Sequence, residues 1–323
     1  MGFEKEVDRL IKSINSVSDQ IRKKVIDFTS SDNTSNAYWS SMSNKLREDF
    51  EELRVIFGKW VNDNIPDEYY RAIQETVKTV KRIPIASTKE IKYSTIIQST
   101  TTQDTLSKII NDSLTSMLTG LDGGEKTLNQ LLRLSQQTLI QEKQLNELVE
   151  QGFVEGGKGV LSENMVGQGS MYGIKRRVQT ELEKQMLEDK FITVVNINGQ
   201  QMHFDPGYYA ELIARTKYIE ASNIGSMQVA RETGTDLIQI TDHNTDCEEC
   251  MEFEGKIFSV SGNDPDFPPL EELPPYHPNC KHTSVPVYRE YLEDKDIDKY
   301  IEFSQGESDI HPTNPAFVPV GER

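Results

Sequence analysis

Apolar residues recur every three or four positions through most of the first half of the chain. Because an α-helix has about 3.6 residues per turn, this spacing places them on one face of a helix. The first such stripe predicts an amphipathic helix from Phe3 to Phe28. Its apolar positions are Phe3, Val7, Leu10, Ile14, Val17, Ile21, Val25 and Phe28.

A second stripe follows the turn-like segment TSSDNTSN, residues 29–36. Its apolar positions are Trp39, Met42, Leu46, Phe50, Leu53, Phe57 and Trp60. We expect the segment NIPDEYY, residues 64–70, to end this helix, because a proline inside a helix removes a backbone hydrogen bond. A third helix should then reach Arg82. Most of these apolar faces are expected to pack within the chain and the rest against partner helices.

A further stripe predicts a second helical pair. Its first helix carries Leu106, Ile109, Ile110, Leu114, Met117 and Leu118. The glycines of GLDGG, residues 120–124, should break this helix, and apolar residues between Leu128 and Leu148 resume the pattern. No fixed-period repeat links the two pairs, which argues against a helical solenoid. Residues 1–151 are therefore predicted to form an extended helical region.

Residues 152–173 contain seven glycines in 22 positions, a density that suits neither a helix nor a strand. We expect a linker here. Gly152, Gly157 and Lys158 match the spacing of a phosphate-binding loop, but Gly159 stands where that loop requires a Ser or Thr hydroxyl for magnesium. A nucleotide site is therefore not expected.

The pattern changes after the linker. The segment FITVVNINGQQMHF, residues 191–204, predicts a β-hairpin with a turn at Asn198-Gly199. Asp205 and Pro206 suit the N-cap and first position of a helix that should end at Gly234. The residues TDLIQIT then predict a strand. Residues 174–289 are thus expected to form a small α/β domain, and the whole chain an α+β fold dominated by helices.

Charge narrows the choice of partners. Acidic residues outnumber basic ones by 52 to 35, which gives a formal charge of −17 and disfavours bulk binding of nucleic acid. The segment Arg71–Lys92 is locally basic, and it could be a solvated helix face, a contact to DNA phosphates or a docking surface for an acidic partner protein. Its basic residues are Arg71, Lys78, Lys81, Arg82, Lys89 and Lys92.

Neither end of the chain suggests a membrane anchor. No apolar run approaches the roughly 20 residues that cross a bilayer, and the start of the chain lacks the apolar core of a signal peptide. We therefore expect a soluble protein made in the cytoplasm. Residues 290–323 hold nine acidic and three basic side chains, and we expect an extended acidic tail.

All three cysteines and three of the five histidines lie in two short stretches. These stretches are TDHNTDCEEC, residues 241–250, and HPNCKH, residues 277–282. Pairs separated by two residues let both side chains turn toward one ion, and mixed thiolate and imidazole ligands suit Zn²⁺. The candidate ligands are Cys247, Cys250, Cys280 and either His277 or His282, with His243 as a weaker candidate. Such a zinc-knuckle-like site would be structural, since it would fix a proline-rich loop that has few apolar side chains of its own.

Three alternatives compete with a zinc site. A disulfide would leave one of the three cysteines unpaired, and disulfides are rare in proteins made in the cytoplasm. A redox-active pair at Cys247 and Cys250 is disfavoured by the acidic neighbours Asp246, Glu248 and Glu249. The motif could also be a former metal site that has lost some of its ligands.

The segment from about Tyr208 to Pro286 resembles the C-terminal region of phage head-morphogenesis proteins, the minor capsid proteins related to the Mu minor head protein. In that family a helix with Ala-Arg-Thr leads to a strand, a Cys-x2-Cys element, a Gly-Lys strand start and a closing His-Pro-x-Cys-Arg-Cys. The matching residues are Ala214, Arg215, Thr216, Cys247, Cys250, Gly255, Lys256, His277, Pro278 and Cys280. Lys281 replaces the Arg and His282 replaces the last Cys, so the fourth ligand stays open.

The resemblance implies a structural, non-enzymatic protein of the virion head. Such proteins are present in a low number of copies near the portal vertex and act in head assembly, DNA packaging or genome delivery. The implied partners are the portal protein and the major capsid protein, and the implied location is the virion, after assembly in the host cytoplasm. No catalytic or cofactor-binding residue is expected besides the zinc ligands.

An alternative comes from another class of proteins. Some relatives of this family carry an ADP-ribosyltransferase domain, and Arg215 with Glu252 and Glu254 could imitate its arginine and paired glutamates. No Ser-Thr-Ser lies between them, and the glutamates fall in the cysteine loop. We therefore expect Arg215 to form a structural ion pair and both glutamates to be solvated.

Overall fold

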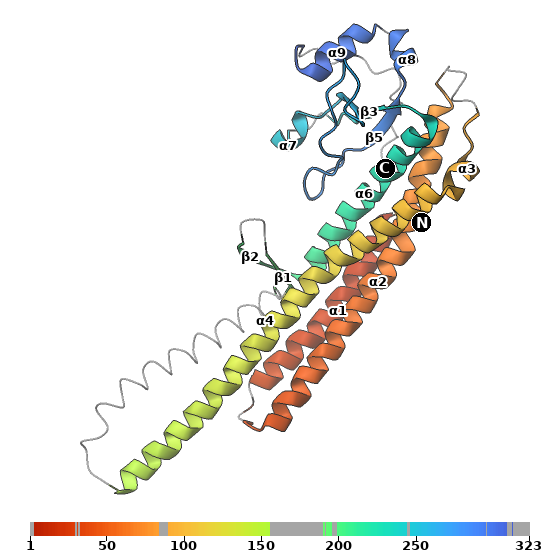
Figure 1. Cartoon of the computed structure of the whole chain (residues 1–323). Coiled ribbons are helices and arrows are strands. Elements are labelled where there is room, and N and C mark those ends of the chain that lie inside the picture. Colours follow the sequence, from red (N-terminus) through yellow and green to blue (C-terminus); the bar gives the residue numbers. More distant parts are fainter. Residues whose placement is uncertain are drawn as a thin grey trace. The chain divides into compact units, whose positions relative to one another are not determined.

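The computed structural model describes residues 3–29, 31, 33–83, 90–155, 190, 192–195, 199–243, 246–294, 296–308 and 312. Long helices dominate it, and a small antiparallel sheet lies in the C-terminal part of the chain (Figure 1). This confirms the predicted α+β class. None of the helices in the described ranges is long and apolar enough to cross a membrane.

The chain divides into two compact units. One comprises Met1–Gly58 and Thr115–Glu211, and the other Lys59–Leu114 and Leu212–Arg323. The domain limits predicted at residues 151, 173 and 289 stay predictions, since residues 156–173 of the expected linker lie outside the described part of the chain.

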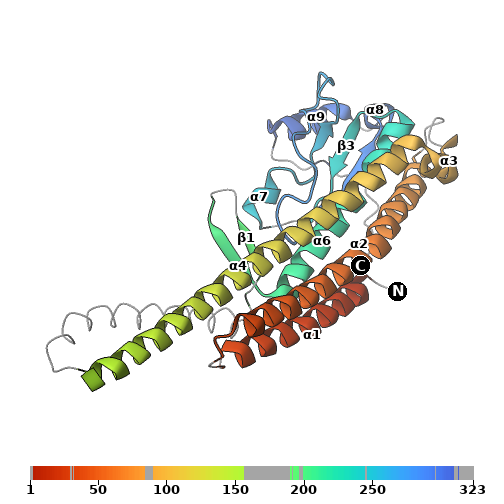
Figure 2. The same cartoon turned by 60° about the horizontal axis from the view of Figure 1, so that its bottom comes forward.

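Helices α1 (Phe3–Thr29) and α2 (Asn36–Val80) begin the chain, and in the first unit α1 lies beside the part of α2 that ends at Gly58 (Figures 1 and 2). The predicted apolar stripes form their buried faces; Val7, Ile14, Phe50 and Phe57 are inaccessible to solvent. Packing of these faces, more than intrinsic propensity, holds helices of this length in place.

Helix α2 does not end at NIPDEYY, so the predicted helix boundary there is wrong. Pro66 lies inside α2, where its ring nitrogen cannot donate to the preceding turn. One turn earlier, the Asn64 side-chain amide donates to the Trp60 carbonyl (2.9 Å). Ile65 and Tyr69, on either side of the proline, are fully buried. Their burial offsets the lost backbone bond and keeps the helix continuous.

Helix α4 (Thr100–Glu155), which follows the short α3 (Tyr93–Gln98), also runs unbroken through GLDGG. The expected break at residues 120–124 is therefore wrong. A Cβ atom at Gly120 would come within 2.7 Å of the Tyr209 ring, whose hydroxyl donates to the Ser116 carbonyl (2.6 Å). Gly120 thus makes room for a neighbouring aromatic ring and does not break the helix.

The predicted hairpin and the helix after it are confirmed. Strands β1 (Ile192–Val195) and β2 (Gln201–Phe204) pair antiparallel, and Gly199 between them has a φ of 76°. The Asp205 carboxylate accepts the backbone N–H of Tyr208 (2.7 Å) at the start of α6 (Pro206–Thr233). Gly234, with a φ of 73°, follows the end of that helix.

A three-stranded antiparallel sheet forms the centre of the C-terminal part, in the order β4-β3-β5. Its strands are β3 (Leu237–Ile240), β4 (Ile257–Ser259) and β5 (Ser284–Val287). Because side chains alternate along a strand, Ile238 and Ile240 of β3 face Met227 and Ala230 of α6. The opposite face packs against two short C-terminal helices.

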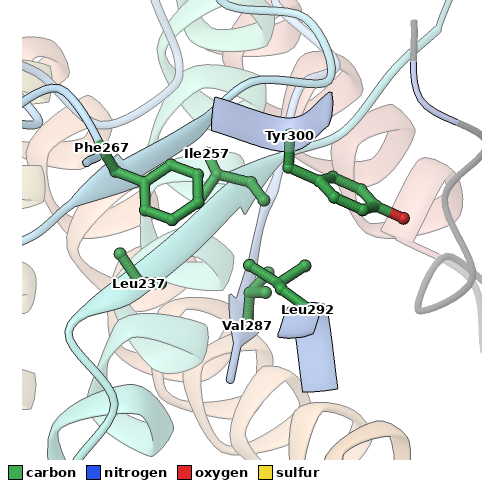
Figure 3. Packing of buried hydrophobic residues seen from close by; sticks show 6 residues of the cluster. All are labelled: Leu237, Ile257, Phe267, Val287, Leu292 and Tyr300. Atoms are coloured by element: carbon green, nitrogen blue, oxygen red, sulfur yellow. The ribbon is translucent and has the colours of Figure 1, made fainter. Parts of the chain in front are cut away.

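These helices are α8 (Arg289–Glu293) and α9 (Ile297–Gln305). The apolar cluster beneath them appears in Figure 3, and it consists of Leu237, Ile257, Phe267, Val287, Leu292 and Tyr300. The expectation of an extended tail from residue 290 is therefore corrected for α8 and α9. Leu292 and Tyr300 bury enough apolar surface to order a segment whose overall composition is acidic.

The backbone groups that point away from β3 are bonded at both outer strands. On β5, the Ser284 N–H donates to Asn223 Oδ1 (2.6 Å), and the Ser284 carbonyl accepts the Ser226 hydroxyl (2.6 Å). Pro286 follows and has no N–H to donate. On β4, the Ile257 N–H donates to the Ser304 hydroxyl of α9 (3.0 Å).

Ser259, at the other end of β4, is bonded by the loop that follows. Its N–H donates to the Pro268 carbonyl, and its carbonyl accepts the N–H of Leu270, each at 2.8 Å. The loop 268–270 therefore runs along the outer side of this strand.

Candidate metal centre

The first cysteine pair lies at a tight turn after β3. Cys247 precedes the one-turn helix α7 (Glu248–Met251), and its carbonyl accepts the N–H groups of Cys250 (3.1 Å) and Met251 (2.9 Å). Gly255, with a φ of 73°, then turns the chain back toward β4. This compact turn brings Cys247 and Cys250 close together.

The second stretch makes a similar turn just before β5. The Cys280 N–H donates to the His277 carbonyl (3.1 Å), and Asn279 between them adopts a φ of 66°. The Thr241 N–H donates to the Thr283 carbonyl (2.8 Å). The pairing of β3 with β5 therefore places the two turns next to each other, although about 30 residues separate them in sequence.

The candidate ligand atoms form two groups that share Cys250. One contains Cys247, Cys250 and His277, and the other contains Cys250, Cys280 and His282. Within each group all ligand atoms lie within 4.8 Å of one another. None of the three cysteines, all of which lie in the described residues, forms a disulfide. The Cys/His groups could hold a metal ion.

Three distances describe the centre of this cluster. The Cys250 and Cys280 sulfurs are 3.9 Å apart. The Cys280 sulfur is 3.4 Å from His282 Nδ1, and the Cys250 sulfur is 3.0 Å from His277 Nε2. Cys250 and Cys280 are almost completely buried, and His282 is 3% exposed.

Each histidine has its other ring nitrogen bonded. His282 Nε2 lies 2.6 Å from the Glu254 carboxylate, and His277 Nδ1 lies 2.8 Å from the Pro278 carbonyl. Outer contacts of this kind fix the orientation of metal-binding imidazoles. Glu254 also accepts the backbone N–H of His243 (3.0 Å), and its side chain is only 10% exposed. The expectation that Glu254 is solvated is therefore wrong, whereas Glu252 is exposed as predicted.

The cluster favours a thiolate at Cys280. Burial by itself raises the pKa of this thiol, but hydrogen bonds from His282 outweigh burial and lower the pKa to about 7. Burial and the neighbouring Cys280 raise the pKa of the Cys250 thiol. Burial alone lowers the pKa of His282, but its contacts with Cys280 and Glu254 reverse the direction and raise it. A cation would complete the deprotonation of both thiols.

His243 lies beside the cluster without joining either ligand group. Its Nε2 is 2.9 Å from the Thr241 hydroxyl. Its ring packs edge-on against the ring of His282, and the two ring centroids are 5.0 Å apart. Burial, followed by the charge of His282, lowers the pKa of His243. The structure therefore gives His243 a packing position at the edge of the cluster.

Asn223 connects α6 to both sides of the cluster and was not predicted from the sequence. Its side chain is fully buried and donates to the carbonyls of Pro274 (3.0 Å) and His282 (3.3 Å). It also accepts the N–H of Ser284. The only sequence signal for this role is a polar residue on the buried face of a helix.

The basic segment Arg71–Lys92 is partly neutralised by its own helix. Arg71 bonds the buried Glu68, and Lys78 bonds Glu75 (2.8 Å). Lys81, Arg82 and Lys92 are exposed, and Lys89 lies outside the described residues.

Comparison with known proteins identifies the C-terminal part. Residues 178–308 match the family model of phage minor capsid protein 2. The chain is therefore similar to the phage minor capsid protein family over its C-terminal part. The matched region includes the three-stranded sheet, the Cys/His cluster and both helices α8 and α9. No curated protein and no solved structure was found to match the chain.

The family match confirms the resemblance seen in the sequence and indicates a structural phage protein. The alternative of an ADP-ribosyltransferase gains no support from the geometry. Glu254 is bonded to His282 and thus lies at the Cys/His cluster.

Proposed function

We propose that this protein is a structural component of a tailed-phage head, bound near the portal vertex, and that it acts in head assembly, DNA packaging or genome delivery. The observation that carries the proposal is the family match over the region that contains the sheet and the Cys/His cluster. The portal protein is the proposed main partner, with the major capsid protein as a second. Several copies, far fewer than those of the major capsid protein, are expected in each virion.

Quantitative mass spectrometry of purified virions tests this function. We expect the protein at a small fraction of the abundance of the major capsid protein. Chemical cross-linking of intact particles should join it to the portal protein. Absence from virions, or abundance equal to that of the major capsid protein, would contradict the proposal.

We further propose that one structural Zn²⁺ is held by Cys247, Cys250, Cys280 and His282. Tetrahedral zinc with Zn–S near 2.3 Å and Zn–N near 2.0 Å places two sulfurs about 3.8 Å apart and a sulfur and a nitrogen about 3.5 Å apart. The Cys250–Cys280 and Cys280–His282 distances of 3.9 and 3.4 Å fit these edges. The Cys250–His277 distance of 3.0 Å is shorter than such an edge.

The surroundings also favour His282 over His277 as the fourth ligand. His282 is buried and its Nε2 meets a carboxylate, which leaves Nδ1 directed toward the Cys280 sulfur. Four protein ligands would fill a tetrahedral site and leave no position for a reacting water, so the metal would be structural. It would join the turn that carries Cys247 and Cys250 to the turn that carries Cys280 and His282, next to β3 and β5. The segment 251–276 between these turns is not as poor in apolar contacts as the sequence suggested, because Phe253, Ile257 and Phe267 pack in the two apolar clusters.

Metal analysis tests the ligand set. Protein purified without chelator should contain about one zinc per chain, and Cys250→Ser should remove most of it. His282→Ala should also lower the zinc content and weaken the cobalt d–d absorption of Co²⁺-substituted protein. His277→Ala is the matched control and should retain nearly all of the zinc. Loss of zinc in the His277 variant alone would assign the fourth position to His277, and a metal-free wild type would refute the site.

A further inference from the structure

A groove lined by positive side chains lies between α2 and α4 in the first unit and shares no residue with the Cys/His cluster. Its volume is about 430 Å³. Ser43 and Arg47 of α2 form one wall, and Lys126, Asn129 and Arg133 of α4 form the other. The two walls are joined where the Ser43 hydroxyl donates to Asn129 Oδ1 (2.9 Å). Short polar side chains at this contact leave the space beside it open.

The groove carries unbalanced positive charge. Arg47, Lys126 and Arg133 are exposed, and none of them has an ion-pair partner within the described residues. The only hydrogen bond of Arg47 among these residues is to Asn44 at 3.3 Å. Three uncompensated cations in one groove contrast with a chain whose net charge is −17. The groove is therefore a local site of attraction for anions.

The one carboxylate that lines the groove does not cancel this charge. Glu125 accepts a bond from Arg54 (2.6 Å), which also contacts Asp122 (2.8 Å). Arg54 also bonds Glu51 (2.9 Å), so one guanidinium is shared by three carboxylates and offsets only part of the charge of Glu125. The three cations of the groove still outnumber the one carboxylate that lines it.

The shape and chemistry of the groove suit phosphate groups. Arginine side chains bind phosphate oxygens through two parallel N–H bonds, and lysine adds a point charge. Lys126 and Arg133 are seven residues apart on α4, which spaces them by about 10 Å along the helix axis. They can therefore meet different phosphates of one strand. No aromatic side chain lines the groove, so stacking with bases is not supported.

We propose that this groove binds the phosphate backbone of nucleic acid without reading its sequence. The choice of nucleic acid over an acidic protein surface rests on the proposed role in the virion head, where packaged DNA is the most abundant polyanion. The site differs from the basic segment Arg71–Lys92, whose cations at Arg71 and Lys78 are already paired.

The test measures binding of the full chain to a fluorescently labelled DNA duplex of arbitrary sequence by anisotropy at several salt concentrations. In the triple variant Arg47→Ala, Lys126→Ala, Arg133→Ala, we expect the Kd to rise at least about tenfold at low salt. A plot of the logarithm of the association constant against the logarithm of the salt concentration has a negative slope. The magnitude of this slope should decrease by about two to three, because each removed cation leaves one phosphate with its counterion in place.

A control variant separates the groove from total charge. The control variant carries three substitutions of exposed cations on α1: Lys5→Ala, Lys12→Ala and Lys23→Ala. It changes the net charge by the same amount as the triple variant of the groove. This variant should raise the Kd less than about threefold. The double variant Arg47→Lys, Arg133→Lys keeps both positive charges and should retain most of the affinity. Circular dichroism of each variant checks its helix content, so that a loss of affinity in the alanine variant can be separated from misfolding.

Four outcomes would overturn the proposal. The first two are wild-type protein that does not bind the duplex, and equal losses of affinity in the groove and α1 variants. The third is groove-dependent binding of a poly-glutamate peptide in preference to DNA, and the fourth is displacement of DNA by millimolar inorganic phosphate at constant ionic strength. The third would assign the groove to an acidic protein and the fourth to a small anion. These results are independent of whether the protein is found in virions, so a failure of the proposed function remains distinguishable.

Discussion

Asn223 illustrates how one buried amide can position a functional cluster. It bonds the backbone at Pro274, His282 and Ser284, and thus holds both flanks of the Cys/His cluster against α6. Because this amide is buried, water cannot replace it as a partner of these backbone groups if the amide is removed.

We expect Asn223→Ala to lower the free energy of unfolding by about 2 to 3 kcal/mol, because it leaves a buried N–H and two carbonyls without a partner. Urea denaturation followed by circular dichroism measures this change. Asn44→Ala, at an exposed position of α2, should change stability by less than about 0.5 kcal/mol. Similar effects of both substitutions would contradict the role assigned to Asn223.

Asp264 provides a pH-dependent contribution to stability. Burial raises the pKa of its carboxyl, but the bonds from Arg289 and from the N–H groups of Asp266 and Phe267 outweigh burial and lower it. A depressed folded-state pKa means that the stabilisation is present above the unfolded pKa and is lost as the pH falls through the folded pKa.

Asp264→Asn should therefore lower the free energy of unfolding at pH 7, by about 1 to 2 kcal/mol. The difference from wild type should begin to shrink as the pH falls below about 4, where the unfolded carboxyl takes up a proton, and should vanish below the lowered pKa of the native carboxyl. Urea denaturation at a series of pH values measures both. A difference that stays constant down to about pH 2, below the usual range of a carboxyl, would show that Asn disturbs the loop by another route.

At the candidate centre, the sequence correctly indicated which residues lie close together through local turns. Cys247 and Cys250 are brought together by a turn with two intervening residues, and a similar turn joins the backbones of His277 and Cys280. Their role as metal ligands stays a prediction. Glu254 could not be predicted, because its partner His282 is 28 residues away and the contact depends on how β3 pairs with its neighbours. The same holds for Asn223, which lies 59 residues from His282.

Among the helices, the two glycines Gly58 and Gly120 occupy opposite environments. A Cβ at Gly58 would meet nothing within 4 Å, whereas one at Gly120 would press into the Tyr209 ring and Ile192. Inside a helix, glycine lowers the free energy of unfolding by up to about 1 kcal/mol relative to alanine. Closer packing against a neighbour can offset this loss only where a side chain would not fit.

Gly58→Ala should accordingly raise the free energy of unfolding by about 0.5 to 1 kcal/mol. Gly120→Ala should lower it by about 1 to 3 kcal/mol, because the methyl group forces the Tyr209 ring out of place. The midpoints of thermal unfolding compare the two variants directly. If both alanines stabilise the protein, α4 does not pack closely against Tyr209.

The same helices show where sequence patterns mislead. Apolar periodicity correctly predicted the buried faces of α1 and α2, since burial follows directly from the 3.6-residue repeat. Pro66 and the glycines of residues 120–124 predicted helix ends that do not occur. These are local preferences of a few kcal/mol at most, and the tertiary contacts of Tyr69 and Tyr209 override them. The helices α8 and α9 were missed because an acidic composition concealed Leu292 and Tyr300.

For the molecule as a whole, a structural metal should influence one part of the chain and spare the rest. We expect a chelator to accelerate hydrogen exchange at the amides of Thr241, Cys250 and Cys280, whose bonds lie at the proposed site. Exchange within α1 should stay unchanged. Mass spectrometry of peptic fragments before and after chelation measures both exchange rates. An equal increase in exchange along the whole chain would contradict a metal site that stabilises only its own surroundings.

The bonded outer edges of the small sheet have a consequence for how copies of the chain can associate. An unpaired strand edge invites another β-strand to add to it, which is a common route to aggregation. Here Asn223, Ser226 and Pro286 close the β5 side, while Ser304 and the loop 268–270 close the β4 side. These bonds oppose the addition of a strand from a neighbouring copy to this sheet, so contacts between copies at its edges should be made by side chains and not by backbone pairing.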